Sequence, residues 1–306
     1  MWPCSIGQGH VFSKGDSLMK KNQNFYIYLF LTPALIIFLS FYLVPIVSVF
    51  VTSFTKWNGF GTVKFIGFKN YIELFKRPEF LISIKNLVSW SVIAATLHVA
   101  FGALIALMLY RKPFGWKFVR SAFMVPMIIS GAAWAVIYRF FFNDDFGVLN
   151  TLIRFVNPDC HIKWFYESPF AFWAITFTWV FYAVYVTLVV LTDLMAIPKD
   201  LHEAAHIEGV TPWQRTRFID LPLIKNSIGV SMIISITARI TMYESISLTS
   251  RGGPGDDTMN LPLIVVQGIT DMKYGHANTA SVIMIIFGVI ALFIVNSIFK
   301  TNKKRG

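Results

Sequence analysis

Charged residues are scarce in this sequence. Asp, Glu, Lys and Arg make up 14% of the 306 residues, whereas hydrophobic residues make up 55%. A typical soluble domain has about 25% charged residues, so this chain has too few of them to coat such a domain. Together with a mean hydropathy of +0.59, the shortage predicts a protein whose solvent is largely the lipid bilayer.

Cysteine is also nearly absent, since only Cys4 and Cys160 occur and no C-x-x-C spacing is present. We therefore expect neither a disulfide framework nor a thiolate-ligated metal site. The sequence has no G-x-x-x-x-G-K-[ST] loop to hold nucleotide phosphates. Any hydrolysis of ATP that drives this protein must take place on another chain.

Long apolar runs are what the sequence does have. A helix needs about 20 residues to cross a bilayer. Six stretches are long and apolar enough, namely residues 26–53, 87–110, 119–142, 170–196, 224–247 and 278–299. They predict an all-α polytopic membrane protein with six transmembrane helices, whose membrane domain covers residues 26–300.

The net charge of +11 indicates an orientation in the membrane and no nucleic-acid partner, because the basic residues lie between apolar runs. They cluster after the second, fourth and sixth runs, as Arg111, Lys112, Lys117 and Arg120, then Lys199, Arg215, Arg217 and Lys225, then Lys300, Lys303, Lys304 and Arg305. Acidic residues dominate the loops after the third and fifth runs. Both the segment 1–25 and the tail 301–306 are therefore predicted to be cytoplasmic.

One loop does not follow this rule. Residues 55–86 contain six basic residues, Lys56, Lys64, Lys69, Lys76, Arg77 and Lys85, although the alternation of the runs places this loop outside. The outside placement is kept because these residues are less dense than those of the cytoplasmic turns and the other loops agree.

The first eighteen residues, MWPCSIGQGHVFSKGDSL, do not have the successive regions of a secretory signal. Met19, followed by Lys20 and Lys21, resembles a natural translation start. We hypothesise that residues 1–18 are a mis-assigned start, with Lys14-Gly15-Asp16 encoded by a purine-rich ribosome-binding sequence. The nucleotide sequence tests this hypothesis.

Residues 198–222 are polar and contain the signals of two short helices. Asp200 and Glu203 predict a capping pair at the start of the first helix, and Gly209 predicts its end. Thr211, Pro212 and Gln214 predict the start of the second helix, which Pro222 is expected to end. Leu201, Ala204 and Ala205 are expected on one face of the first helix, where two alanines allow close approach to a partner.

Two patterns overlap in this loop. His202-Glu203-Ala204-Ala205-His206 matches the H-E-x-x-H motif, in which two histidines bind zinc and the glutamate acts as general base. The third ligand position of the extended motif is Pro212, which cannot bind a metal. We therefore expect no metal site and no catalytic residue, and an intramembrane zinc protease remains the weaker alternative.

The second pattern is E-A-A-x3-G-x9-I-x-L-P, which Glu203, Ala204, Ala205, Gly209, Ile219, Leu221 and Pro222 match in register. It resembles the coupling loop of sugar-type permeases of ABC importers. Stretches such as SFTKWNGF, FIGFKNYIELFKRPEF, SRGGPGDDT and YGHANTAS extend the resemblance over residues 25–300. Glu208 and Val210 stand where that family usually has Asp and Ala.

The resemblance implies a permease subunit of a bacterial plasma membrane importer and no enzyme. Its substrate would be a sugar or oligosaccharide delivered by an extracytoplasmic solute-binding protein. Its other implied partners are a second homologous permease and two ATP-binding subunits, which would carry ATP and Mg, so that this chain needs no cofactor of its own. Glu203, Ala204, Ala205, Gly209, Leu221 and Pro222 would couple it to the ATPase, with Glu203 meeting a basic residue there. The competing class is a stand-alone secondary carrier, which needs no such loop.

Arg239, Tyr243 and Glu244 are candidates for the substrate path, because ionisable groups inside a span are costly and often functional. Arg239 and Glu244 are five residues apart, a poor alignment for a salt bridge within one helix. Tyr243-Glu244 stands where the resembling family often has Phe-Asp. Carboxylate and guanidinium groups suit sugar hydroxyls, and an Arg239 that faces the path favours an anionic sugar. Alternatively, Arg239 reaches the interface or pairs with the partner permease.

Aromatic residues are abundant in the spans, and a sugar-binding stripe is one interpretation of them. Packing between helices is the commoner role for aromatic residues in spans. We therefore expect packing for Trp134, Trp173, Trp179, Tyr182 and Tyr185, and also for His98 in the second span.

Overall fold

The computed structural model describes residues 15–299, with side chains from residue 25 onward. Most of the segment that concerns the hypothesis of a start at Met19 lies outside the described residues, so this hypothesis stays a prediction. The chain divides into two units, Met1–Val51 and Thr52–Gly306. The described part of the first unit is a helix formed by α1 (Gly15–Phe38), the π-helical turn η1 (Leu39–Leu43) and most of α2 (Val44–Ser53). Its apolar side chains are exposed, as expected of a helix that lipid or another chain covers.

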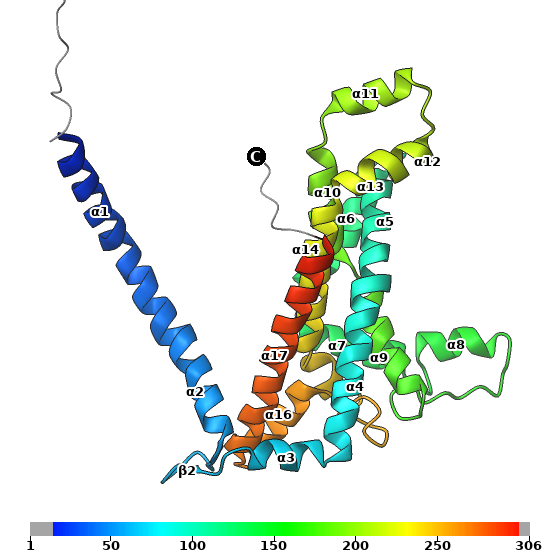
Figure 1. The fold of residues 1–306 in the computed structure, drawn as a ribbon. Helices are drawn as coiled ribbons and strands as arrows, with labels where there is room; N and C mark the ends of the chain where they lie inside the picture. The colour runs from blue at the N-terminus through cyan, green and yellow to red at the C-terminus, as the bar shows by residue number, and fades with distance from the viewer. Residues whose placement is uncertain (1–14, 300–306) are drawn as a thin grey trace, which may run out of the picture. The chain divides into compact units, whose positions relative to one another are not determined.

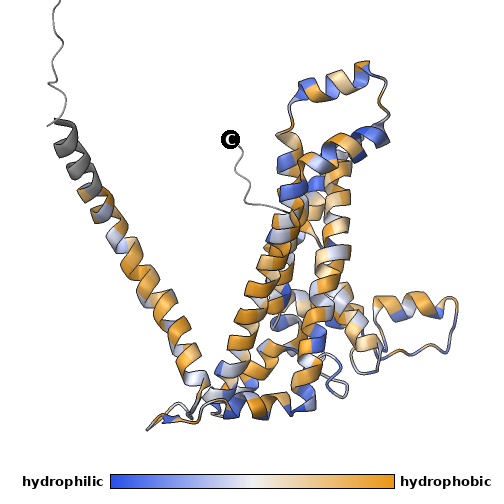
Figure 2. Ribbon diagram, viewed as in Figure 1, coloured by the Kyte–Doolittle hydropathy of each residue, from blue (hydrophilic) through white to orange (hydrophobic). Residues whose placement is uncertain are grey.

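The fold is all-α, as the sequence predicts. In the described part of the chain, only β1 (Thr55–Lys56) and β2 (Lys64–Phe65) are strands, and they pair antiparallel. Four helices are long and apolar enough to cross a membrane, Phe25–Ser53, Pro78–Tyr110, Phe170–Met195 and Tyr274–Phe299, and the number is six if each of two bent pairs of helices is one span. In Figure 2, hydrophobic residues follow the bundle helices and hydrophilic residues gather at the loop around α12.

The first two long helices of the second unit form one packed layer. α4 (Pro78–Ile93), η2 (Ala94–His98) and α5 (Val99–Tyr110) form one continuous span, and α9 (Phe170–Val180) with α10 (Val184–Met195) forms the next. Gly102 lets α5 approach α10 closely, because a β-carbon there would lie 2.6 Å from Val186. The Thr187 hydroxyl donates to the carbonyl of Gly102 at 3.0 Å and closes this contact.

The third predicted span, 119–142, is not one helix. α6 (Trp116–Met124) and the 3-10 turn η3 (Val125–Ile128) meet α7 (Gly131–Phe141) at 107°. Pro126 lies at the start of the 3-10 turn, and the backbone becomes extended at Ile129. Ser130 then caps α7, accepting a hydrogen bond from the Ala133 amide at 3.2 Å. The bend therefore has a local cause, a proline followed by a new N-cap.

The fifth predicted span, 224–247, is also shorter than expected. α14 (Lys225–Ile240) ends before Thr241, and α15 (Glu244–Ser247) is a separate turn. At its other end, α14 meets the loop helices Pro212–Leu223 at 67°. The last long helix, α17 (Tyr274–Phe299), packs against α14 and α16 (Leu261–Thr270).

Aromatic residues fill the space between α7 and α9, which confirms the packing role predicted for Trp134 and Tyr182. Their rings lie 4.9 Å apart, and the Trp134 indole donates to the carbonyl of Thr178 at 2.8 Å. His98 packs edge-on to Trp179, and its Nδ1 lies 3.0 Å from the carbonyl of Val180. Trp173, in contrast, is 59% exposed, so packing within this chain does not account for it.

The two ends of the second unit differ in structure (Figure 1). At one end α11 (Lys199–Ile207) and α12 (Pro212–Arg215) project beyond the bundle. At the other end lie β2 and α3 (Lys69–Phe75), and α8 (Val148–Arg154) extends to the side of the bundle. The sequence places the loops 55–86 and 198–222 on opposite sides of the membrane, and they lie at opposite ends of the second unit.

Candidate functional site

The first loop helix, α11, begins two residues earlier than predicted. Pro198 is its N-cap, no side chain caps it, and Asp200 lies in its first turn, so the predicted capping role of Asp200 is wrong. The fixed φ of Pro198, −57°, already suits a helix start at Lys199. Asp200 still favours the helix there through its charge near the N-terminus.

Gly209 ends α11, as predicted. Its φ is +72°, a left-handed conformation that side chains with a β-carbon rarely adopt. The Val210 amide donates to the carbonyl of Ala205 at 2.9 Å, and the Gly209 amide donates to that of His206 at 3.1 Å. These bonds satisfy carbonyls at the end of the helix, so Gly209 forms a rigid elbow.

The second loop helix begins as the sequence predicts. Thr211 and Gln214 form a reciprocal capping box, with Pro212 in the first turn. Pro222, however, does not end the helix, which continues from α12 through the π-helical turn η4 (Thr216–Asp220) into α13 (Leu221–Leu223). The Leu221 amide bonds to the carbonyl of Thr216 in this wider turn, so the amide that Pro222 lacks falls where regular α-helical bonding is already interrupted.

His202 fastens α11 to the base of the loop. Its Nε2 lies 3.0 Å from Oδ1 of Asp220, whose side chain is only 1% exposed, and its Nδ1 lies 3.3 Å from the hydroxyl of Tyr110 at the end of α5. Arg215 adds a longer contact to the second oxygen of Asp220 at 3.8 Å. We call His202, Asp220, Tyr110 and Arg215 the loop anchor.

A second contact ties the loop to α5. Arg111 donates from Nη2 to the buried hydroxyl of Thr216 at 2.9 Å, and that hydroxyl also donates to the carbonyl of Pro212 at 3.1 Å. Arg111 follows Tyr110 directly, so two consecutive residues at the end of α5 hold both loop helices. The loop is therefore attached to the end of α5 at two points.

The zinc interpretation does not fit this geometry. Both ring nitrogens of His202 lie within hydrogen-bond distance of a protein oxygen, so neither is open to a metal alongside His206. Among residues 15–299, no cluster of three or more His, Cys, Asp or Glu side chains is arranged to hold a metal ion. The H-E-x-x-H match contributes one structural histidine.

The remaining loop residues face different surroundings. Ala205 is buried, whereas Glu203, Ala204 and Gly209 are exposed and Leu201 is 45% exposed, so the face predicted for Leu201, Ala204 and Ala205 is divided. Leu221 packs on the apolar cluster between α5 and α10, and Pro222 is exposed. The residues predicted to couple the chain to an ATPase thus form an exposed helix over a buried attachment.

Arg239 lies near the end of α14 and contacts an aromatic ring. Its guanidinium carbon lies 4.1 Å from the centroid of Trp179 on α9, and its Nη1 donates to the sulfur of Met242 at 3.3 Å. No carboxylate in the described part of the chain forms an ion pair with it. From its sequence, Trp179 was expected only to pack between helices, so this cation–π contact with Arg239 was not predicted.

Tyr243 and Glu244 do not lie next to Arg239. The helix break after Ile240 separates them, so Glu244 begins α15 and its carboxylate lies against Gly131, at the start of α7, with no room for a β-carbon there. Tyr243 is half-buried and packs on the main apolar cluster. Arg239 and Glu244 therefore face two different helices, α9 and α7.

Buried hydroxyls continue along α14 from Arg239 at helical spacing. Ser235 and Ser231 are 4% and 0% exposed, and neither hydroxyl has a hydrogen-bond partner among the described residues. The indole nitrogen of Trp179 is likewise buried without a partner. Unpaired polar groups are costly in a membrane protein, so this strip is an unusual feature of α14.

Comparisons with known proteins identify the family. Residues 98–305 match the family described as binding-protein-dependent transport system inner membrane component. The chain belongs to this family. It is 30% identical over 290 residues to the probable ABC transporter permease protein YurN of Bacillus subtilis, covering 92% of this chain and 99% of that protein. It is also 30% identical over 264 residues to the trehalose/maltose transport system permease protein MalF of Thermococcus litoralis, covering 84% and 87% of the two chains.

A solved structure has the same fold. A chain of the bacterial alginate ABC transporter, in complex with an alginate pentasaccharide-bound periplasmic protein, superimposes with a TM-score of 0.81. The identity is 21%, and the match covers 98% of that chain and 94% of this permease. At this identity the similarity shows the fold and nothing about the substrate.

Family membership decides several predictions. The chain is a multi-pass permease subunit of an ABC importer and no enzyme, because ATP is hydrolysed by separate subunits in this family. Its transport depends on a binding protein. The alternatives of a stand-alone secondary carrier and of a zinc protease are therefore wrong, whereas the roles predicted for individual residues remain predictions.

Proposed function

We propose that this permease passes a sugar or oligosaccharide across the bacterial plasma membrane after an extracytoplasmic solute-binding protein delivers it. A second homologous permease completes the pathway, and two ATP-binding subunits with ATP and Mg drive it. Both termini and the loop of α11 and α12 face the cytoplasm, in keeping with the clusters of Lys and Arg there. A sugar is proposed because the MalF relative is named for trehalose and maltose transport.

One observation carries the coupling role: α11 is exposed yet fastened to the membrane helices by the loop anchor. Glu203 and Ala204 face outward, where an ATPase can receive them. Closure of the ATPase pair would displace α11, and Tyr110 and Asp220 would pass this displacement to α5 and α14. The displaced α11 would thereby favour either the outward-open or the inward-open conformation of the membrane helices, as alternating access requires.

Arg239, Tyr243 and Glu244 are the proposed contacts with the solute. Arg239 has no carboxylate partner among the described residues, so an anionic sugar suits it best. The ring of Trp179 contacts the guanidinium of Arg239, and a bound sugar ring would replace Trp179 in this contact. Glu244, which is exposed at the start of α15, supplies an acceptor for sugar hydroxyls.

The substitution Glu203→Lys tests the coupling role. In the assembled importer in nanodiscs, we expect import to fall at least about tenfold, because reversing a charge at an interface costs several kcal/mol. ATP hydrolysis should continue at its basal rate but no longer respond to the solute-binding protein. Glu203→Gln, which removes the charge without reversing it, should show a smaller loss. Unaltered import by the Glu203→Lys protein would refute the role.

A further inference from the structure

The basic loop over residues 55–86 is not explained by the coupling or path residues. It carries six Lys or Arg and only two acidic residues, Glu73 and Glu79. In the second unit, the hairpin β1–β2 and α3 of this loop lie at the opposite end from α11 (Figure 1). Basic residues usually concentrate in the cytoplasmic loops of membrane proteins. Their abundance in a loop on the outer side therefore suggests that they have a function in that loop.

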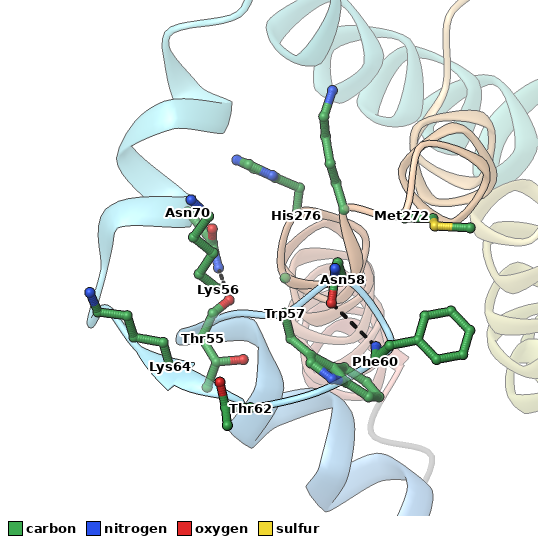
Figure 3. A pocket seen from close by; sticks show the side chains of 12 residues that line it. Thr55, Lys56, Trp57, Asn58, Phe60, Thr62, Lys64, Asn70, Met272 and His276 are labelled. Atoms are coloured by element: carbon green, nitrogen blue, oxygen red, sulfur yellow. Dashed lines mark hydrogen bonds between the residues drawn. The ribbon is translucent and has the colours of Figure 1, made fainter.

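A cavity of about 530 Å³ lies between this hairpin and the start of α17, a size within the range of ligand pockets. Figure 3 shows the side chains that line it. They include three lysines and two exposed or half-exposed aromatic rings, namely Lys56, Lys64 and Lys273 with Trp57 and Phe60. The cavity is thus basic at its rim and aromatic on its wall.

Hydrogen bonds and close packing hold the hairpin beside the cavity against α17. Asn70, which is 2% exposed, donates from its side-chain amide to the carbonyls of Ser53 and Thr55 at 2.8 and 2.9 Å. Thr279 on α17 donates to the same carbonyl of Ser53 at 3.1 Å. Gly275 has no room for a β-carbon beside Thr55. The hairpin is therefore held against α17 before any partner arrives, which lowers the entropy cost of binding.

The charges at the rim are unbalanced. Lys56 and Lys64 are directly opposite each other in the strand register, and like charges at such positions repel. No described carboxylate forms an ion pair with either lysine. The nearby acids have other partners: Glu73 contacts His276 at 2.9 Å and Lys69 at 3.9 Å, and Asp271 contacts Lys273 at 3.3 Å. A carboxylate supplied by a partner would relieve the repulsion.

We propose that an acidic loop of the extracytoplasmic solute-binding protein docks in this cavity, with its carboxylates between Lys56 and Lys64 and an apolar side chain on Trp57 and Phe60. This docking rests on the proposed function, which sets the orientation of the chain. A protein suits the surface better than a free sugar, because the basic surface continues outside the cavity at the exposed Lys69 on α3. A central pocket with an aromatic wall and a charged rim is the usual anatomy of a protein interface.

The double substitution Lys56→Glu with Lys64→Glu tests the docking in the assembled importer in nanodiscs. We expect the concentration of solute-binding protein that half-maximally stimulates ATP hydrolysis to rise at least about tenfold, with the maximal rate unchanged. Added salt should weaken docking to the unsubstituted importer but not to this variant. The matched control, Lys76→Glu with Lys85→Glu, makes the same charge change in the same loop outside the cavity and should shift that concentration less than about threefold.

Three outcomes would overturn the docking. The first is stimulation of the Lys56→Glu, Lys64→Glu importer at the same concentration of binding protein as the unsubstituted one. The second is that free trigalacturonate binds the unsubstituted importer but not the Lys56→Glu, Lys64→Glu variant, while the binding protein still stimulates ATP hydrolysis by this variant normally. That result would assign the cavity to an acidic sugar. The third is an unsubstituted importer that no binding protein stimulates, which would overturn the proposed function as well.

Discussion

The loop anchor makes a quantitative prediction for His202→Ala. The substitution removes the 3.0 Å contact to Asp220, whose side chain is 1% exposed and so cannot replace the lost partner with water. Arg215 remains at 3.8 Å, which is beyond hydrogen-bond distance. A hydrogen bond to a charged group contributes about 1.5–3 kcal/mol. Since about 1.4 kcal/mol corresponds to a tenfold change, the detached state of α11 should become roughly 10- to 100-fold more populated.

Two measurements check this prediction. Hydrogen exchange of the α11 amides in the assembled importer should speed up by the same factor, because a detached α11 frays more often. The number of ATP molecules hydrolysed per solute imported should rise, because the ATPase then moves a helix that no longer pulls on α5 and α14. Basal ATP hydrolysis should not change.

Two further variants separate positioning from a general loss of structure. His206→Ala changes the same residue type on the same helix, but the side chain of His206 is exposed and makes no described hydrogen bond, so exchange and coupling should stay normal. His202→Gln combined with Asp220→Asn replaces the pair by two amides that can bond to each other and should restore part of the coupling. If His202→Ala and His206→Ala behave alike, the loop anchor does not position α11.

Three other substitutions test separate parts of the structure. Arg239→Ala should lower import of an acidic oligosaccharide at least about tenfold more than import of a neutral one, measured with labelled sugars in vesicles; equal losses would count against a role of Arg239 in the path. Gly102→Ala should destabilise the bundle by about 1–3 kcal/mol in thermal unfolding, because its β-carbon would overlap α10, whereas Gly288→Ala has ordinary space and should be tolerated; equal stability of the two variants would contradict the packing. The hydrogen bond from His276 holds the pKa of the Glu73 carboxyl below its usual range. The ionised carboxylate therefore stabilises the folded protein above the unfolded pKa of about 4.3, and this stabilisation is lost as the pH falls through the lower pKa of the folded state. Glu73→Gln should therefore flatten the dependence of the unfolding temperature on pH in the acid range, and an unchanged dependence would exclude this pair as its source.

Features with local causes could be predicted from the sequence. The apolar runs predicted the four long helices that can cross a membrane, because the length of such a helix is fixed by the bilayer. Gly209 and the capping box of Thr211 with Gln214 were correct because a cap depends on a few adjacent residues. The same local rules failed where two signals competed, as at Pro198 and Asp200 for the start of α11.

Local rules did not predict the bends in the spans. Pro126 and Ser130 are visible in the sequence, yet apolar residues on both sides favoured one helix through them. Similarly, Pro222 does not end its helix, because a π-helical turn takes up the irregularity. Whether a proline ends, bends or is absorbed by a helix depends on what packs around it.

By itself, the sequence determined the membrane environment, the all-α class and the position of the polar loop that carries α11 and α12, since these follow from composition and from motifs of adjacent residues. The tertiary structure decided which distant side chains meet. It brought His202 to Asp220, 18 residues away, Arg239 to Trp179 on another helix, and the hairpin lysines to the start of α17. Such contacts depend on the packing of whole helices, which no short stretch of sequence encodes. The anchor under α11 and the basic cavity at the other end of the bundle could therefore be found only in the folded chain.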